Sequence, residues 1–326
     1  MGPLAFSILR LLNDGEICAI DHLAQSLKVS PNRILKTIDE IDQCGVVLKK
    51  TPDLGIQWPE PLNWLDENEI ISNLPQTNLP FHLIILDTID STNRFLLDQV
   101  AADFKCLHGN PVIITELQTQ GRGRLGRRWY SGLGDSLTFS LFWRFDCSVR
   151  FLSGLSLAIG VALIRALTHF AIKDLTLKWP NDVLFHSRKL AGILIELCSN
   201  IRSGSAVVIG IGLNIQLSNL AKENIDQAFV DLFAITGRVI DRNKILAVLL
   251  SELSAVLIDF NHFGFSYFRN EWVRYHAYEG QLITITLPDD TIVTGVVVGV
   301  EFDGSLTLVS ETGEKKSYSS GEINLR

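Results

Sequence analysis

The hydrophobic positions at the start of the chain predict three short helices. Apolar residues recur every three or four positions, the spacing of one helix face, at Leu4, Ile8, Leu11 and Leu12. A second helix is predicted over residues 20–27, IDHLAQSL. Ser30 and Pro31 suit the cap and first turn of a third helix, which Gly45 ends. This third helix carries the apolar residues Ile34, Leu35, Ile38 and Ile41.

The pattern then changes from helical to alternating spacing. Residues 46–58, VVLKKTPDLGIQW, alternate and turn at their centre, as a two-stranded ribbon does. A helix, a helix-turn-helix and a ribbon in this order resemble a winged helix-turn-helix domain. We therefore predict such a DNA-binding domain over residues 1–64.

The middle of the chain mixes strand and helix patterns after a proline-punctuated linker. Strands are predicted at FHLIIL, PVIITEL, SLTFSLFW, TLKW, KLAGILIEL and SAVVIGIGLNI. Helices are predicted at SGLSLAIGVALIRALTHF and, twice more, within residues 243–275. This mixture predicts a multidomain α+β protein with a mixed-sheet domain over residues 65–275.

The end of the chain carries only strand patterns. They are separated by the turn pairs Asp289-Asp290, Asp303-Gly304 and Thr312-Gly313. Short strands at this spacing predict a small β-barrel over residues 276–326.

Composition narrows the class of protein. A chain of 326 residues, 47% of them hydrophobic, can bury more than one core. Its longest charge-free tract, residues 151–164, is shorter than the roughly 20 residues that cross a bilayer, so we predict a buried helix and no membrane partner. The five cysteines are scattered without a CxxC pair, and the seven histidines form no metal-spaced pair. These features, with no secretory leader, predict a cytoplasmic location.

Charge in the predicted DNA-binding domain is mixed. Residues 1–60 hold six basic and eight acidic residues, so affinity for phosphate depends on where the cations lie. Ser30, Arg33 and Lys36 stand at the start of the predicted recognition helix, which would face base edges. The alternative is a helix-turn-helix used only for packing or regulation.

A glycine-spaced arginine loop stands out in a chain of net charge −7: GRGRLGRRWYS, residues 121–131. Glycine permits close backbone approach, and the planar guanidinium matches phosphate or carboxylate oxygens. A nucleic-acid contact, a cradle for nucleotide phosphates and an ordinary solvated loop all fit these residues. The loop lacks the Lys-Ser/Thr ending of a phosphate-binding Walker motif and does not lead into an apolar helix as a dinucleotide fingerprint does.

Further polar motifs interrupt the predicted strand ends. They are DSTN (90–93), Gln118, KWPND (178–182), KLAG (189–192) and GIGLNI (210–215). Each alone has an ordinary explanation; residues 91–93, for instance, suit a helix cap. Together and in this order they resemble the biotin protein ligases. The helix-turn-helix in front and the ending SGEINLR resemble the bifunctional bacterial type, which also represses the biotin operon.

This resemblance implies a central domain of the class II synthetase and biotin–lipoate ligase type and an SH3-like barrel at the end. It implies that biotin is activated with ATP and Mg²⁺ to biotinyl-5′-AMP. Biotin is then transferred to a lysine of the biotin carboxyl carrier protein domain of acetyl-CoA carboxylase. Biotin would also be the precursor of a corepressor, and the adenylate would promote a homodimer that binds operator DNA.

The resemblance also implies roles for single residues. The biotin-binding residues would be Ser91, Thr92, Asn93, Gln118, Arg122, Gly123, Arg124, Lys189 and Gly192. The ATP- and adenylate-binding residues would be Arg122, Arg124, Arg127, Trp129, Asn181, Lys189, Asn214 and Phe229. The catalytic residues would be Lys189, Asp182 and Arg124, with Asn181 and Asp182 near magnesium and Ser30, Arg33 and Lys36 on DNA.

Two alternatives remain beside the ligase. One is a transcription regulator that senses biotinyl-adenylate without efficient transfer, against which Lys189 and Asp182 argue. The other is a lipoate or octanoyl transferase, a class that shares the domain architecture and lacks the GRGRxGRxW loop. Leu125 departs from the arginine of the enterobacterial relative, and Phe229 stands where repressor-type relatives often carry tryptophan.

Overall fold

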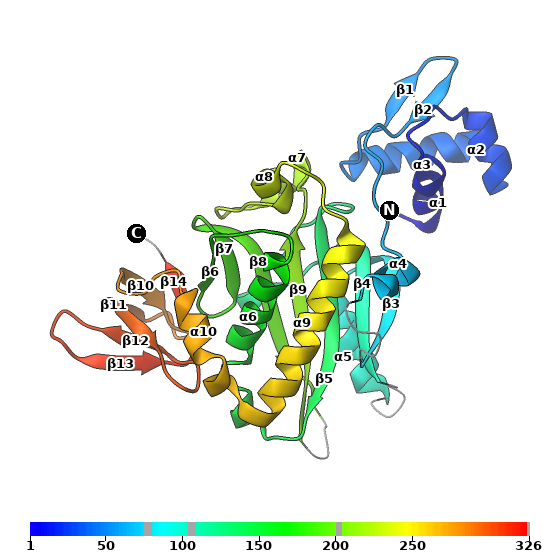
Figure 1. The fold of residues 1–326 in the computed structure, drawn as a ribbon. Coiled ribbons are helices and arrows are strands. Elements are labelled where there is room, and N and C mark those ends of the chain that lie inside the picture. Colours follow the sequence, from blue (N-terminus) through cyan, green and yellow to red (C-terminus); the bar gives the residue numbers. More distant parts are fainter. Residues whose placement is uncertain (75–79, 104–108, 200–203, 325–326) are drawn as a thin grey trace.

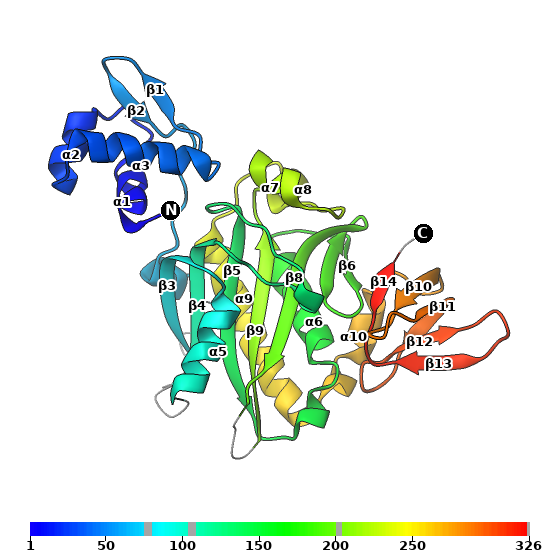
Figure 2. The same cartoon turned by 180° about the vertical axis from the view of Figure 1, so that it is seen from behind.

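The protein is described by a computed structural model that covers residues 1–74, 80–103, 109–199 and 204–324 (Figure 1). Within these residues the strands form a two-stranded, a seven-stranded and a five-stranded sheet. The two-stranded sheet belongs to an N-terminal unit that stands beside the rest of the molecule (Figures 1 and 2).

The N-terminal unit contains α1 (Pro3–Leu11), α2 (Ile20–Leu27), α3 (Pro31–Gln43), β1 (Lys49–Thr51) and β2 (Gly55–Gln57). The Ser30 side chain caps α3 by accepting a hydrogen bond from the Arg33 amide at 3.3 Å. Ile34, Ile38 and Ile41 are fully buried, as their spacing predicts. Leu35, the fourth apolar residue of this helix, lies one position around the helix from Ile34 and is 47% exposed.

The central sheet is mixed, with the order β3-β4-β5-β9-β8-β7-β6. Only β3 and β4 are parallel among these neighbours; the other pairs are antiparallel. The strands are β3 (Phe81–Ile89), β4 (Asn110–Gln118), β5 (Ser136–Phe145), β6 (Leu175–Lys178), β7 (Asp182–Phe185), β8 (Arg188–Leu197) and β9 (Ser205–Asn214). The mixed sheet predicted from the sequence is therefore present.

Helices cover both faces of this sheet (Figures 1 and 2). The long helices α6 (Leu155–Thr168) and α9 (Arg242–Phe263) pack on one face, and α5 (Thr92–Asp103) packs on the other. Strand alternation explains the division, because Val207 and Ile209 of β9 join the first core whereas Val208 joins the second. The helical stretches Val149–Thr168 and Arg242–Phe263 have the length and apolar composition of a membrane span, but most of each is buried in this core.

The C-terminal sheet is antiparallel, with the order β13-β12-β11-β10-β14. Its strands are β10 (Leu282–Thr286), β11 (Ile292–Val300), β12 (Leu306–Val309), β13 (Lys315–Tyr318) and β14 (Glu322–Asn324), and α10 (Arg269–Arg274) precedes it. Asp290, Gly304 and Gly313 adopt the positive φ angles that the predicted turn pairs require. The sheet shares one hydrophobic core with the central domain.

The segment between the N-terminal unit and the central sheet is not a plain linker. It contains α4 (Glu67–Ser72), capped by Asp66. A buried ion pair joins Arg242 to Glu116 at 2.8 Å, and Glu116 also accepts a hydrogen bond from the Leu65 amide at 2.7 Å. Because a buried charge is stable only when it is paired, this network fixes the start of the central domain.

Some elements were missed by the sequence prediction. Strand β7 lies between a three-residue and a two-residue turn and is only four residues long, too short to show a period. The short helices α7 (Asn219–Asn224) and α8 (Leu232–Thr236) were also not predicted. The four cysteines that the structure describes are free thiols, and Cys106 lies outside the described residues, as do Leu325 and Arg326 of the SGEINLR motif.

Candidate active site

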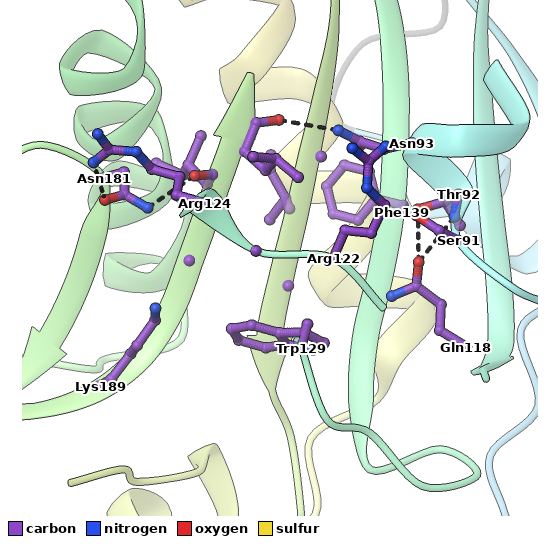
Figure 3. Close-up of a pocket in the computed structure, with 17 residues that line it drawn as sticks. Ser91, Thr92, Asn93, Gln118, Arg122, Arg124, Trp129, Phe139, Asn181 and Lys189 are labelled. Atoms are coloured by element: carbon purple, nitrogen blue, oxygen red, sulfur yellow. Dashed lines mark hydrogen bonds between the residues drawn. The ribbon is translucent and has the colours of Figure 1, made fainter. Parts of the chain in front are cut away.

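The predicted polar motifs meet in one pocket over the middle of the central sheet (Figure 3). It is open to solvent, has a volume of about 470 Å³ and shares lining residues with a wider cavity of about 1290 Å³. The pocket is called the narrow end here, and the cavity the wide end. The narrow end is lined by Ser91, Thr92, Asn93, Gln118, Arg122, Gly123, Arg124, Trp129, Asn181, Lys189, Gly192, Gly210 and Gly212, among others.

Glycines on β8 and β9 make the floor of the narrow end. A Cβ atom on Gly210 would lie 2.1 Å from Asn93 Oδ1, and one on Gly212 would lie 2.5 Å from the Trp129 ring. A Cβ on Gly192 would meet Lys189 Cε at 3.1 Å. Side chains at these positions would therefore occupy the space that the pocket needs.

Residues 91–93 begin α5 and also line the narrow end. The Thr92 amide donates a hydrogen bond to Gln118 Oε1 at 2.9 Å, which ties α5 to the end of β4. Ser91 Oγ accepts from the Arg94 amide at 3.4 Å, so Ser91 acts as a helix cap as well. The cap and the pocket lining are therefore two properties of the same residues.

The arginine loop forms a hairpin across the pocket. Arg122 and Arg128 pair as an isolated antiparallel bridge, and the Gly123 amide donates to the Arg127 carbonyl at 2.8 Å. At the tip, Leu125 and Gly126 both have positive φ angles. Trp129 leaves the hairpin with its ring over Gly212. The loop is therefore an ordered structure, in contrast to the solvated-loop interpretation.

Each arginine of the hairpin has a different partner. Arg122 binds Glu196 of β8 at 2.9 Å, and Arg124 donates to Asn181 Oδ1 at 3.0 Å (Figure 3). Arg127 forms a two-pronged ion pair with Glu322 of β14. Arg128 donates to the Thr119 carbonyl and lies over the Tyr130 ring. The first three partners tether the hairpin to β8, to the turn before β7 and to the C-terminal sheet.

Lys189 stands where the narrow and wide ends join. Its ammonium lies 2.9 Å from Asp182 Oδ1 and 5.7 Å from the centre of a Trp129 ring. The Lys189 backbone pairs with residues 228–230, because its amide donates to the Ala228 carbonyl and its carbonyl accepts from Val230. This pairing brings Phe229 next to Lys189.

Phe229 lines a further pocket of about 370 Å³ beside the wide end, together with Trp129, Lys189 and Asn214. Asn214 donates to the Val230 carbonyl at 3.0 Å, so its amide holds the segment that carries Phe229. The two residues that were predicted beside an adenylate are thus neighbours, with Asn214 in a supporting position.

The wide end carries an excess of positive charge. Its lining contains Arg124, Arg127, Arg128, Lys178 and Lys189, five basic residues, against the three acids Asp182, Asp226 and Glu322. Burial lowers the pKa of Lys178 and of Arg124 from their ordinary values, although the nearby Asp182 acts in the opposite direction on both. Partly desolvated cations of this kind favour an anionic ligand.

The predicted magnesium neighbourhood offers few ligands. Asp182 is paired with Lys189, and the Asn181 amide group donates to the Ile193 carbonyl at 3.0 Å. Among the residues that the structure describes, no three His, Cys, Asp or Glu side chains cluster as metal ligands. The predicted DNA-binding residues Ser30, Arg33 and Lys36 are exposed on the N-terminal unit, away from this site.

Several residues of the site were not predicted from the sequence. Glu196, Ser140 and Glu322 bind predicted residues, and Lys178 was quoted in the KWPND motif without a role. Glu196 could have been noticed, since it is an acidic residue in the otherwise apolar stretch LAGILIEL. Glu322 stands in the ending SGEINLR, which was quoted without a role for this residue. Ser140 carried no signal, because its partner Asn93 lies 47 positions away in the chain.

Comparisons with known proteins agree on one family. Residues 85–214 match the Biotin/lipoate A/B protein ligase family, and residues 280–326 match the Biotin protein ligase C terminal domain. The chain is 33% identical to the "Bifunctional ligase/repressor BirA" of Salmonella typhimurium over 98% of its own length and 97% of the relative's. The protein of the same name from Escherichia coli is 32% identical, with 98% and 96% covered.

A solved structure gives the same result. The biotin protein ligase from Aquifex aeolicus in complex with biotin and ATP superimposes with a TM-score of 0.64 at 31% identity. The match covers 75% of this chain and 98% of that one.

Proposed function

This chain belongs to the biotin protein ligase family, and from that membership we propose that it activates biotin with ATP and transfers it to a protein lysine. The reaction forms biotinyl-5′-AMP with release of pyrophosphate, and the acceptor is a biotin carboxyl carrier protein domain of acetyl-CoA carboxylase. The observation that carries the proposal is the joining of two pockets at Lys189: one hydrogen-bonded and narrow, the other wide and cationic.

The two ends match the two substrates in chemistry. The narrow end offers the hydroxyl groups of Ser91 and Thr92 and the amide group of Gln118, which suit the neutral ureido ring of biotin, and Asn93 lines the same end. The wide end offers five cations, which suit the phosphates of ATP. In the first step a carboxylate attacks an α-phosphate, and these two anions approach each other only where fixed cations neutralise them.

Lys189 is placed for this task because its ammonium lies between the two ends. We assign it to the biotin carboxyl and the α-phosphate, with Arg124 beside it and Arg122 at the biotin end. Asp182, 2.9 Å from Lys189, is our candidate to accept the proton of the incoming acceptor lysine. Arg127, Trp129, Asn181, Asn214 and Phe229 complete the ATP side of the site.

The arginine hairpin covers the site on the side opposite the glycine floor. Its backbone pairing and three tethers hold it over the glycine floor. A closed loop excludes water and so protects the mixed anhydride of biotinyl-5′-AMP from hydrolysis.

Magnesium is part of the proposal as the ion that accompanies ATP. The single carboxylate of Asp182 with Asn181 beside it fits an ion held mainly by phosphates, as magnesium usually is. When bound, it would neutralise charge on the phosphates.

The catalytic proposal is tested with purified protein, ATP, magnesium, biotin and a biotin carboxyl carrier domain. We expect the intact mass of the carrier domain to increase by one biotinyl group, and to stay constant when ATP is omitted. Free biotinyl-5′-AMP without a mass shift would favour the alternative, a regulator that senses the adenylate without efficient transfer. The absence of both products would contradict the proposal.

We further propose that the chain is a biotin-responsive repressor. The arrangement of α1, α2, α3 and the β1–β2 ribbon supports a winged helix-turn-helix, with Arg33 and Lys36 exposed at the start of α3. On the ribbon, Lys50 is bound to Asp42 at 2.8 Å and to Asp39 at 3.3 Å, whereas Lys49 is exposed. Base contacts would therefore depend on α3, and Lys49 would add a phosphate contact from the ribbon.

DNA binding is tested by gel shift on duplex DNA from upstream of the biotin biosynthesis genes, at fixed salt with biotin and ATP present. Arg33→Ala with Lys36→Ala should weaken binding by at least about tenfold, the loss of one or two base or phosphate contacts. Lys173→Ala removes an exposed charge between α6 and β6, outside the N-terminal unit, and should have no effect. Equal binding by all variants would assign the N-terminal unit to packing or regulation.

The remaining parts of the proposal concern organisation. We propose domains at residues 1–64, 65–275 and 276–326; the separate N-terminal core supports the first boundary. We also propose that the C-terminal sheet is an SH3-like module, that the adenylate promotes a homodimer and that the protein is cytoplasmic. Sedimentation with and without biotin plus ATP tests the dimer, since identical values would contradict it.

A further inference from the structure

Asn93 is fully occupied by the protein itself. Its carbonyl oxygen accepts a hydrogen bond from Ser140 Oγ at 2.5 Å. Its amide group donates to the Leu194 carbonyl at 3.3 Å and to Glu196 Oε2 at 2.8 Å. Asn93 is also only 3% exposed. An amide with both donors used and its acceptor engaged holds other groups in place and has little left for a ligand.

Glu196 connects Asn93 to the arginine hairpin. Its carboxylate binds Arg122 through two contacts, Nη2 to Oε1 at 2.9 Å and Nη1 to Oε2 at 3.3 Å. On β8 it follows Gly192 and Leu194 by steps of two, so it continues the strand face that forms the floor of the narrow end. A two-pronged carboxylate–guanidinium pair fixes orientation as well as distance.

We propose that Glu196 is a positioning residue: it ties Arg122 to Asn93 and thereby holds the hairpin closed over the narrow end. This inference rests on the proposed function, in which the narrow end binds biotin. The wide end does not depend on this tie, because Arg124 and Arg127 have separate anchors in Asn181 and Glu322. Glu196 therefore affects biotin binding selectively.

The test is Glu196→Gln in the full chain, with the KM for biotin and the KM for ATP measured separately in adenylate formation. Glutamine keeps the size of the side chain but presents an NH₂ group to the donors of Arg122 or Asn93. We expect the KM for biotin to rise about tenfold, the effect of losing one charge-assisted hydrogen bond, with the KM for ATP changed less than about twofold. Glu196→Asp retains the charge and should recover part of the loss.

Two controls separate positioning from structure. Glu311→Gln removes an exposed carboxylate between β12 and β13 and should leave both KM values unchanged. In a double-mutant cycle, Glu196→Gln should add little to Arg122→Ala, because both remove the same tie.

The outcomes are distinguishable. An inactive wild-type protein would overturn the proposed function, whereas an active wild type with an unchanged Glu196→Gln variant would overturn only this inference. A proportional rise of both KM values, or a fall in kcat alone, would show a structural role and would also overturn it. The inference would also be overturned if the effects of Glu196→Gln and Arg122→Ala on the KM for biotin were additive. It would equally be overturned if Glu196→Asp raised this KM as much as Glu196→Gln does.

Discussion

The narrow and wide ends of the site are prepared for their ligands in opposite ways. At the narrow end the polar groups bind one another: Thr92 with Gln118, Ser140 with Asn93, and Glu196 with Arg122. The wide end also contains ion pairs, of Lys189 with Asp182 and of Arg127 with Glu322, but its five cations exceed its three acids. Burial lowers the pKa of two of these cations, Lys178 and Arg124. The hydrogen bonds that shape the narrow end are therefore formed without a ligand, whereas the wide end has a net positive charge that an anionic ligand would neutralise.

This difference follows from the chemistry of the proposed ligands. A neutral ring is selected by shape and a few fixed hydrogen bonds, which require preformed geometry. A polyphosphate is bound by charge, which acts over longer distances and tolerates looser geometry. Substitutions at the narrow end should therefore act through geometry, and those at the wide end through charge.

The largest effect is expected where the two ends join, at Lys189. Lys189→Ala should lower the rate of adenylate formation about 10²- to 10³-fold, the size seen when one charge-stabilising donor is removed. Lys189→Arg keeps the charge and should retain more activity. The measurement is single-turnover formation of biotinyl-5′-AMP, with thermal unfolding as a check on the fold. Near-normal adenylate formation by Lys189→Ala would remove this residue from its role.

Gly210→Ala tests the preformed geometry of the narrow end. The new Cβ would lie 2.1 Å from Asn93 Oδ1, so Asn93 and its partners would have to shift. Overpacking of about 1–3 kcal/mol corresponds to about a 5- to 150-fold rise in the KM for biotin. Gly160→Ala in α6 is the matched control, because its new Cβ would meet only the flexible end of Leu177, at 3.0 Å. An equal KM for biotin in the Gly210→Ala and Gly160→Ala variants would mean that the narrow end is not rigid.

Most of the fold could be predicted because its elements carry strong local patterns. Consecutive residues encode the Ser30 cap of α3, the alternation of β5, the apolar run of β9 and the turn pairs of the C-terminal sheet. Strand β7 and helix α4 were missed because they are short and their formation depends on packing against distant elements. Leu35 shows the limit of periodicity, which does not define the edge of a helix face.

The residues of the site could be predicted from the sequence, but the contacts between them could not. The motifs supplied Lys189, Arg122 and Asn93, and the structure places all three around one pocket. That Asn93 is occupied by Ser140 and Glu196 depends on contacts between α5, β5 and β8, which no local pattern encodes. The distinction between a residue that contacts a ligand and one that positions another residue therefore required the structure.

Lys178 tests whether charge governs the wide end. Lys178→Met should raise the KM for ATP about tenfold at neutral pH, the loss of one charge-assisted contact, and leave the KM for biotin unchanged. Burial lowers the pKa of Lys178 below its ordinary value of 10.5, so its charge is lost as the pH rises through that lowered pKa. The KM for ATP of the wild type should therefore rise with pH before an ordinary lysine would titrate.

Lys178→Arg provides the control for the pH effect, because arginine stays charged throughout. Its KM for ATP should be nearly independent of pH over the range in which the wild type loses affinity. A pH profile of Lys178→Met identical to that of the wild type would show that another group causes the dependence.

The smallest effect is expected at Phe229, which lies outside both the hydrogen-bonded and the cationic groups. We assign Phe229 to stacking on the adenine of ATP. Phe229→Leu keeps most of the apolar area but removes the aromatic face, which corresponds to about a threefold rise in the KM for ATP. Because residues 228–230 are held to Lys189 by backbone hydrogen bonds, the substitution should not disturb Lys189 or biotin binding. Phe229→Trp should restore or exceed wild-type affinity for ATP. Should Phe229→Leu change the KM for biotin as much as that for ATP, stacking on adenine would be the wrong explanation, and the 228–230 segment would instead support the junction of the two ends.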